Sequence, residues 1–165
     1  MPSEPVRDAV LDELRRLRTR LPRLTGALAA RVDGLVVAQD TPGVDPEGLA
    51  ALTASALGGS VLIADATAQG SFRELLLHST GGYVATYAAG RSTVLTLLAE
   101  DRINVGRLHL EGRRFGARIG ELLDAAEDTA AEVPARAAAR PPAARTRPTR
   151  TPRGAATDAR TATDS

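Results

Sequence analysis

Few residues in this chain have the types and spacings that catalysis or metal binding requires. The two histidines, His78 and His109, have no partner nearby at a metal-ligand spacing, and the sequence contains no cysteine. Cysteine nucleophiles, thiolate metal sites and disulfides are therefore excluded. A Ser/His/Asp triad can be drawn only by choosing Ser79, His78 and Asp65, and no motif supports that choice. We expect both histidines to be surface residues and the protein to use no metal and no cofactor.

Phosphate-binding and nucleic-acid-binding signals are also missing. The sequence has neither G-x-x-x-x-G-K-S/T nor G-x-G-x-x-G, so no glycine-rich loop is predicted to hold a nucleotide. Glu100 and Asp101 directly precede a predicted helix, where acids interact favourably with the helix dipole. Only two Phe and two Tyr are present, which leaves little aromatic surface for base stacking. These patterns predict a protein that is not an enzyme and does not bind nucleic acid.

Charge is distributed unevenly along the 165 residues. All 21 basic residues are arginine; 14 of them lie in residues 1–132 beside 18 acids, and seven lie in residues 133–165 beside two acids. The first part is mildly acidic, which does not favour a nucleic-acid-binding surface. The end of the chain is rich in Arg, Pro, Ala and Thr and lacks bulky apolar residues, so we expect a disordered tail over residues 128–165. Its arginines would either bind an acidic partner or remain solvated.

No segment has the pattern of a secretory signal or a membrane span. The first residues carry acids and arginines from Glu4 onward without an apolar stretch. The longest uncharged run, from Gly48 to Ala64, is only 17 residues and contains glycines, serines and a threonine. We therefore expect a cytoplasmic protein without membrane insertion.

Apolar periodicity and turn residues predict three helices and five strands. The first helix covers residues 6–21, followed by a hairpin of residues 25–31 and 35–40 that turns at Asp33-Gly34. Asp45 and Pro46 begin a second helix, which continues to about residue 68. Short turns separate strands at 72–79, 82–88 and 92–99, which are therefore antiparallel neighbours. Asn104 begins the last helix, which we expect to end near Glu127.

The second helix is apolar on two sides. One seam contains Leu49, Leu52, Ala56, Gly59 and Ile63; the other contains Ala50, Ala54, Leu57, Val61, Ala64 and Ala68. Because one sheet face can bury only one side of a helix, the other side must meet another element or a second copy of the chain. Without such a partner we expect Leu57 and Val61 to be exposed. The alternative interpretation ends the helix at Gly58-Gly59 and makes Val61-Leu62-Ile63 a strand.

The last helix has glycines at positions 112, 116 and 120, on or beside its apolar face. Each glycine costs a helix about 1 kcal/mol relative to alanine. Close approach to another backbone would offset that cost; otherwise the glycines lie on an exposed flank.

Four segments in this order resemble the roadblock/dynein light chain family. They are VDGLVVA at 32–38, DPEGLAALTA at 45–54, GYVATYAAG at 82–90, and LTLLA with INVGRL within 95–108. The resemblance covers residues 7–126, and bacterial members of this kind resemble the GTPase-activating partner in bacterial gliding. It divides the chain into an N-terminal extension (residues 1–6), a roadblock-like domain (7–127) and the tail. The glycine pair Gly58-Gly59 in the middle of the long helix departs from the family pattern.

The resemblance implies an α+β fold and a function. The fold is a five-stranded antiparallel sheet of order 2-1-5-4-3, roadblock/profilin-like, between the long helix on one face and the two terminal helices on the other. It further implies a homodimer made by antiparallel long helices and by edge pairing of the third strands, acting as an adaptor for a small Ras-like GTPase in bacterial signalling. The implied interface residues are Leu49, Leu52, Ala56, Leu57, Val61, Ala64, Leu75 and Leu77. The open alternatives are a signalling scaffold without a GTPase partner and a small-molecule sensor domain.

Overall fold

Eight elements follow one another along residues 1–138, the part of the chain that the computed structural model describes. They are α1 (Glu4–Arg20), β1 (Leu24–Arg31), β2 (Val36–Asp40), α2 (Pro46–Ala66), β3 (Glu74–Ser79), β4 (Gly82–Ala89), β5 (Thr93–Glu100) and α3 (Val105–Ala138). The number, type and order of the predicted elements are confirmed.

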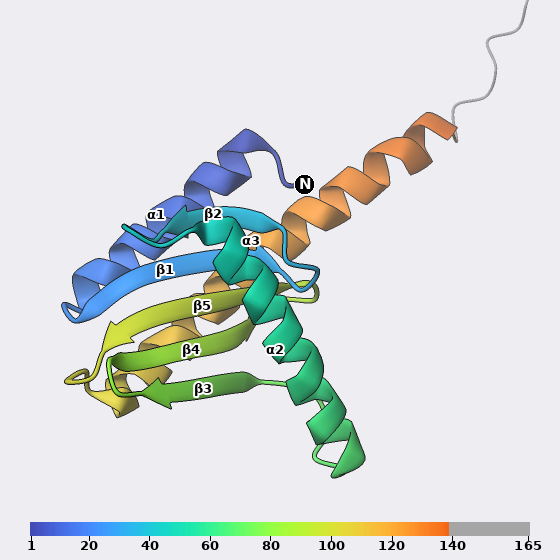
Figure 1. The fold of residues 1–165 in the computed structure, drawn as a ribbon. Helices are drawn as coiled ribbons and strands as arrows, with labels where there is room; N and C mark the ends of the chain where they lie inside the picture. Colours follow the sequence, from blue (N-terminus) through green and yellow to red (C-terminus); the bar gives the residue numbers. More distant parts are fainter. Residues whose placement is uncertain (139–165) are drawn as a thin grey trace, which may run out of the picture.

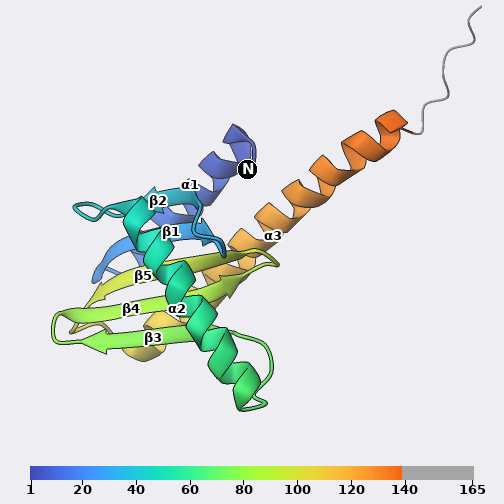
Figure 2. The ribbon, with the colours of Figure 1, turned by 45° about the vertical axis from the view of Figure 1, so that its right-hand side comes forward.

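The five strands form one antiparallel sheet of order β2-β1-β5-β4-β3. Helix α2 crosses one face, and α1 and α3 cover the other (Figures 1 and 2). The order places β5 at the centre, with the β1–β2 hairpin on one side and the β3–β4 hairpin on the other, so β2 and β3 are the edge strands. The predicted fold class and strand order are confirmed.

The main core lies between the sheet and the layer of α1 and α3. Its largest fully buried side chains from the helices are Val10, Leu14, Leu17, Leu108, Phe115 and Ile119. A much smaller cluster of buried residues, Leu28, Ala30 and Ala50, lies on the opposite face under α2. The two faces of the sheet are therefore covered very unequally. Since buried apolar area sets most of the stabilisation, α1 and α3 stabilise the sheet far more than α2 does.

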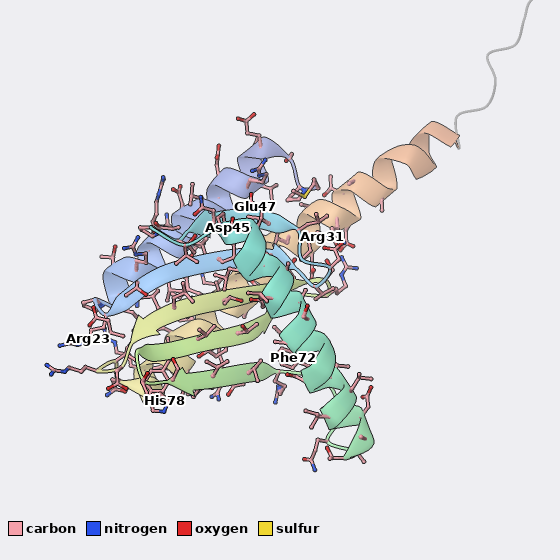
Figure 3. The ribbon with its side chains drawn as sticks, in the orientation of Figure 1. Arg23, Arg31, Asp45, Glu47, Phe72 and His78 are labelled. Carbon is pink, nitrogen blue, oxygen red and sulfur yellow. The ribbon has the colours of Figure 1, made fainter. Side chains whose placement is uncertain are left out.

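Both predicted helix caps are present. The Gly48 backbone N–H donates to Asp45 Oδ2 at 3.0 Å, and Asp45 lies at the first turn of α2 (Figure 3). The Arg107 backbone N–H donates to Asn104 Oδ1 at 2.9 Å. Each cap satisfies a backbone donor that has no partner within its own helix. These local signals therefore place the starts of α2 and α3 correctly.

Other predicted boundaries differ from the structure. Helix α2 continues through Gly58 and Gly59, so the alternative strand at 61–63 is wrong. Helix α3 continues to Ala138, which makes the predicted boundary after Glu127 too early. Residues 128–138 are rich in alanine, the residue with the highest helix propensity, and they extend a helix that packing has already nucleated. Of the predicted disordered tail, residues 139–165 lie outside the described residues.

Two oppositely oriented pairs of charged residues join α1 to α3. The buried Glu13 carboxylate accepts hydrogen bonds from Arg118 of α3 at 2.8 Å and from Arg16 at 2.7 Å. Seven residues further along α1 and seven residues earlier in α3, Arg20 lies 3.8 Å from the buried Glu111. One carboxylate oxygen of each glutamate has no partner among the described residues. Buried charges of this kind favour one alignment of the helices more than they raise stability.

The glycines of α3 allow the helix to approach β4 closely. A Cβ added at Gly116 would lie 3.0 Å from the Ala88 carbonyl oxygen, and one at Gly112 would overlap the Tyr87 ring. A Cβ at Gly120 would overlap the backbone of Gly90. Of the two alternatives that the sequence left open, close approach to another backbone is therefore the correct one. The two glycines of α2 differ, since a Cβ at Gly58 or Gly59 would meet nothing within 4 Å.

We expect the two sets of glycines to respond oppositely to alanine. In Gly120→Ala the new Cβ collides with backbone, and overpacking of this kind costs about 1–3 kcal/mol, so the melting temperature should fall by about 5 °C. Gly58→Ala is the matched control, because it adds helix propensity without a collision and should raise stability by up to about 1 kcal/mol. Thermal unfolding followed by circular dichroism measures both changes. An unchanged melting temperature in Gly120→Ala would show that α3 does not pack on β4 as described.

Candidate functional site

The surface most unlike an ordinary solvated face is the side of α2 that points away from the sheet. We call it the outer face of α2. Its three large side chains are strongly exposed: Leu52 by 71%, Leu62 by 70% and Ile63 by 67%. Small or weakly polar residues share this exposed face: Ser55, Gly59 and Ala66. No charged residue occurs from Gly48 to Ala64, so the outer face lacks the charges that normally keep an exposed helix solvated.

The opposite side of α2 lies against its own sheet. Leu57 is only 8% exposed and Ala50 only 1%, while Val61 and Ala64 are half-buried. The expectation that Leu57 is exposed in a single chain is therefore wrong, and Val61 is partly covered. The seam with Leu57 packs on the sheet, whereas Leu52 and Ala56 of the other seam are exposed. Periodicity identified two apolar seams and could not tell which one the sheet covers.

Helix α2 is only partly supported by the sheet. It packs on β1 and β2, at the edge of the sheet far from β3. It then crosses the sheet diagonally, and its C-terminal end extends past β3 (Figures 1 and 2). Much of its apolar surface therefore has no partner among the described residues.

The edge strand β3 adds to this apolar surface. Leu75 pairs in register with Thr86, and Leu77 pairs with Val84; these residues lie on the face of the sheet that α2 crosses. Leu75 is half-buried and Leu77 is 52% exposed. The expectation that helices cover both faces of the sheet thus does not hold at β3. Because β3 is last in the strand order, its outer edge also leaves backbone N–H and C=O groups without a strand partner in residues 1–138.

Helix α2 is also long and apolar for a helix of a folded domain. By length and composition alone, Pro46–Ala66 is a candidate membrane span. The expectation that no segment resembles a membrane span is therefore wrong for α2, because the single charges at its ends do not break the apolar stretch. A single helix of this kind is weak evidence for a membrane protein.

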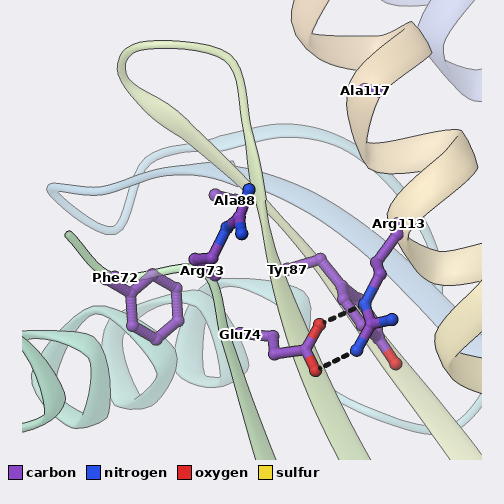
Figure 4. Close-up of a pocket in the computed structure, with 7 residues that line it drawn as sticks. All are labelled: Phe72, Arg73, Glu74, Tyr87, Ala88, Arg113 and Ala117. Carbon is purple, nitrogen blue, oxygen red and sulfur yellow. Dashed lines mark hydrogen bonds and ion pairs between the residues drawn. The ribbon is translucent and has the colours of Figure 1, made fainter. Parts of the chain in front are cut away.

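A second feature lies on the other face of the sheet, where β3 and β4 meet the flank of α3. It is a surface hollow of about 620 Å³, lined by Phe72, Arg73, Glu74, Tyr87, Ala88, Arg113 and Ala117 (Figure 4). The Arg113 guanidinium donates two hydrogen bonds to the Glu74 carboxylate, at 2.7 and 2.6 Å. Such a bidentate pair combines charge attraction with a defined geometry.

The ionisable groups around this hollow act on one another. The hydrogen bonds from Arg113 hold the pKa of Glu74 below its ordinary value, and partial burial opposes that change. His109 Nδ1 lies 3.7 Å from the same carboxylate and 3.1 Å from the Tyr87 hydroxyl. Burial raises the pKa of Tyr87, so this phenol remains protonated. Sequence reasoning missed this cluster, because Glu74 and Arg113 are 39 residues apart and no local pattern relates them.

The ionisable groups in and near this hollow are engaged in contacts with one another and with neighbouring residues. Glu74 is neutralised by Arg113, and the second histidine, His78, is exposed, stacked on Tyr83 at 4.2 Å and hydrogen-bonded to Asp101 at 3.2 Å. Within residues 1–138 no group of three or more His, Asp or Glu side chains is placed to hold a metal ion. Both histidines therefore have surface contacts as expected, although His109 is the more buried of the two.

Comparisons with known proteins place this geometry in context. The model of the Roadblock/LC7 domain matches residues 10–99. A search of curated protein sequences gives no match. Among solved structures, an MglB with a tetrameric arrangement is similar with a TM-score of 0.69 and 19% identity, over 78% of this chain and 94% of that one.

Two further solved structures agree with this likeness. The gliding protein MglB of Thermus thermophilus has a TM-score of 0.68 and 18% identity, over 78% of this chain and 95% of that one. A Roadblock/LC7 domain of Streptomyces avermitilis has a TM-score of 0.64 and 21% identity, over 68% of this chain and 96% of that one. At these identities the likeness is one of fold.

The Glu74–Arg113 pair makes a testable prediction about acid titration. Since the pKa of Glu74 is lowered on folding, the pair stabilises the folded state above the ordinary value of 4.5, and this contribution is lost as pH falls through the lowered pKa. In Arg113→Gln we expect the pKa of Glu74 to rise. NMR titration of the Glu74 carboxyl carbon measures the change, with Arg23→Gln as a control that leaves it unaltered. A wild-type pKa at or above 4.5 would contradict the pair.

Proposed function

Because the chain belongs to the Roadblock/LC7 domain family, we propose that it is a non-enzymatic, homodimeric adaptor that binds and regulates a small Ras-like GTPase in the bacterial cytoplasm. The observation that carries the proposal is the uncharged outer face of α2, whose C-terminal end extends past the edge strand β3 (Figures 1 and 2). Domains of this family generally act as regulators without catalytic activity, and the neutralised Glu74 and exposed His78 agree with such a role.

A second copy of the chain is the partner best suited to this surface. An uncharged helix face with small residues between larger ones packs on an identical helix without leaving a buried charge unpaired. At the same time, two β3 edges can pair with each other as antiparallel strands and satisfy their free backbone groups. A single two-fold axis relating both contacts would cover α2 and β3 together. An MglB of the same fold is described with a tetrameric arrangement, so self-association occurs in a structural relative.

The implied interface residues divide into two groups under this proposal. Leu52 and Ala56 are exposed and Leu49 is half-buried on α2, and Leu75 and Leu77 follow on β3. These five are available to a second copy. Leu57, Val61 and Ala64 lie on the side of α2 that faces the sheet, so their part would be to support the helix from below.

The GTPase partner follows from the family resemblance. Such a dimer would present two α2 helices side by side as a platform for the GTPase. A platform without catalytic residues changes GTPase activity only by binding the states of the GTPase with unequal affinity, because equal affinity shifts no equilibrium. Regulation here is therefore a difference between two binding constants.

The proposed homodimer can be tested with a charged substitution on the outer face of α2. Leu52→Asp should convert the dimer to monomer, because it places an unpaired charge in the proposed contact while leaving the chain's own core untouched. Leu110→Asp on α3 is the matched control. The Leu110 side chain is 65% exposed, similar to the 71% of Leu52, and it lies outside the proposed contact. Sedimentation at micromolar concentration measures both variants, with circular dichroism to establish folding. A wild-type chain that sediments as a 17.2 kDa monomer contradicts the homodimer.

The proposed GTPase regulation can be tested by measuring nucleotide binding and GTPase binding. The purified protein should bind no nucleotide and hydrolyse no GTP alone, and it should bind a Ras-like GTPase of its own cell with different affinities for the GDP and GTP-analogue forms. Titration calorimetry with wild type, Leu52→Asp and Leu110→Asp tests whether binding requires the dimer. Intrinsic GTP turnover would overturn the proposal. Indifference to the GTPases of the cell would instead favour a signalling scaffold of the same fold.

A further inference from the structure

The edge strand β3 has little support from the helices of its own chain. Its inner edge pairs with β4 along its length, from Glu74 opposite Tyr87 to Ser79 opposite Gly82. Helix α3 packs on β4 and β5, and α2 packs on β1 and β2, so neither helix covers β3 to a comparable extent. The strand that would receive a second copy is thus held mainly by one neighbouring strand. Segments with so few buried contacts open locally at low free energy.

Glu74, the first residue of β3, connects this strand to α3. Its carboxylate accepts two hydrogen bonds from Arg113 and lies 3.7 Å from His109, and both of these residues are on α3. The connection spans the open hollow, so no apolar packing replaces it there (Figure 4). At the other end of β3, His78 makes a single hydrogen bond of 3.2 Å to Asp101 between two exposed side chains. The Glu74 connection is therefore the stronger of the two.

Glu74 also ends the loop that connects α2 to β3. Between Ala66 and Glu74 the chain turns through Ala68 and Gly70, which have φ values of 54° and 86°. The positive φ of Ala68 is unfavourable for a residue with a side chain. The C-terminal end of α2 extends past β3, away from the strands β1 and β2 on which the helix mainly packs (Figures 1 and 2). A fixed Glu74 thus anchors both the start of β3 and the end of the loop that follows α2.

We infer that Glu74 and Arg113 form a positioning pair that holds the β3 edge in the geometry required for pairing with a second copy. The inference rests on the proposed homodimer and adds a residue pair that touches no part of the contact itself. Glu74 points to the α3 side of the sheet, opposite to Leu75 and Leu77. Its effect on a second copy would therefore be transmitted through the strand backbone.

The pair should matter more for assembly than for global stability. The Arg113 side chain is 63% exposed, and exposed ion pairs add little to the stability of a fold. The main core between the sheet and the layer of α1 and α3 does not include Glu74 or Arg113. Loss of the pair would loosen β3 alone, and a loosened edge must be ordered again when a second copy binds.

Glu74→Gln and Arg113→Gln test the inference. Each should weaken dimerisation by about tenfold, because two pairs are lost per dimer, while the melting temperature at low protein concentration changes by less than about 2 °C. The dimer dissociation constant of the double variant should not exceed that of the weaker-dimerising single variant, because both substitutions remove the same Glu74–Arg113 interaction. Arg113→Lys should fall between wild type and Arg113→Gln, because lysine keeps the charge and loses the bidentate geometry. Asp128→Asn is the matched control, since Asp128 forms a 2.6 Å pair with Arg91 away from β3.

Amide hydrogen exchange of β3 provides a measurement that does not require a dimer. In Glu74→Gln on the Leu52→Asp background, the amides of residues 75–79 that bond to β4 should exchange faster, with those of β1 and β5 unchanged. A wild-type monomer would refute the proposed homodimer and leave this exchange experiment as the test of the pair. The inference is wrong if the dimer constants of both variants equal that of wild type, if β3 exchange is unaltered, or if weaker dimerisation only follows a matching fall in melting temperature.

Discussion

The organisation of this protein depends on one mismatch, between a helix that is apolar on two sides and a sheet that can bury only one of them. Helix α2 carries no charge from Gly48 to Ala64, yet only Ala50, Thr53 and Leu57 of its residues are buried. Leu52, Leu62 and Ile63 remain in water, at a cost of roughly 1.5–3 kcal/mol for each side chain that a partner would cover. The folded chain therefore presents an apolar helix face that no described residue covers.

The other face of the sheet shows how the chain remains stable in spite of this mismatch. Helices α1 and α3 bury nearly the whole main core, and the glycines at 112, 116 and 120 let α3 lie directly on β4. The helix propensity that these glycines lose is offset by closer packing. Because α1 and α3 stabilise the sheet, α2 is free to expose its outer face without unfolding the domain.

Close packing of α3 on β4 has a further consequence for β3. A helix that lies over β4 and β5 does not reach the edge of the sheet, so a hollow forms beside β3 and the Glu74–Arg113 pair spans it. The edge strand and the outer face of α2 therefore share one property: both have little support from the other residues of the described part of the chain, 1–138. Both features belong to the region where the proposed second copy would bind, and this agrees with the function of the family as adaptors.

The sequence by itself determined the elements of this protein, and the tertiary structure decided how their surfaces are used. Caps at Asp45 and Asn104, apolar periodicity and turn glycines act within a few residues, so they were readable directly and placed the helices and strands in the right order. The resemblance to a known family supplied the strand order. The end of α3 was misplaced, because an alanine-rich segment is compatible with helix or coil and only an existing helix extends it.

The candidate site could be predicted only in part, for a related reason. Two apolar seams on α2 were visible, yet Leu57 proved to face the sheet and Leu52 to face solvent, since periodicity gives the angle between seams and not their absolute direction. The Glu74–Arg113 pair joins residues 39 positions apart, and the exposed edge of β3 follows from where α3 comes to lie. Such properties arise from packing between distant segments, which is decided by the whole fold and not by any local stretch of the chain.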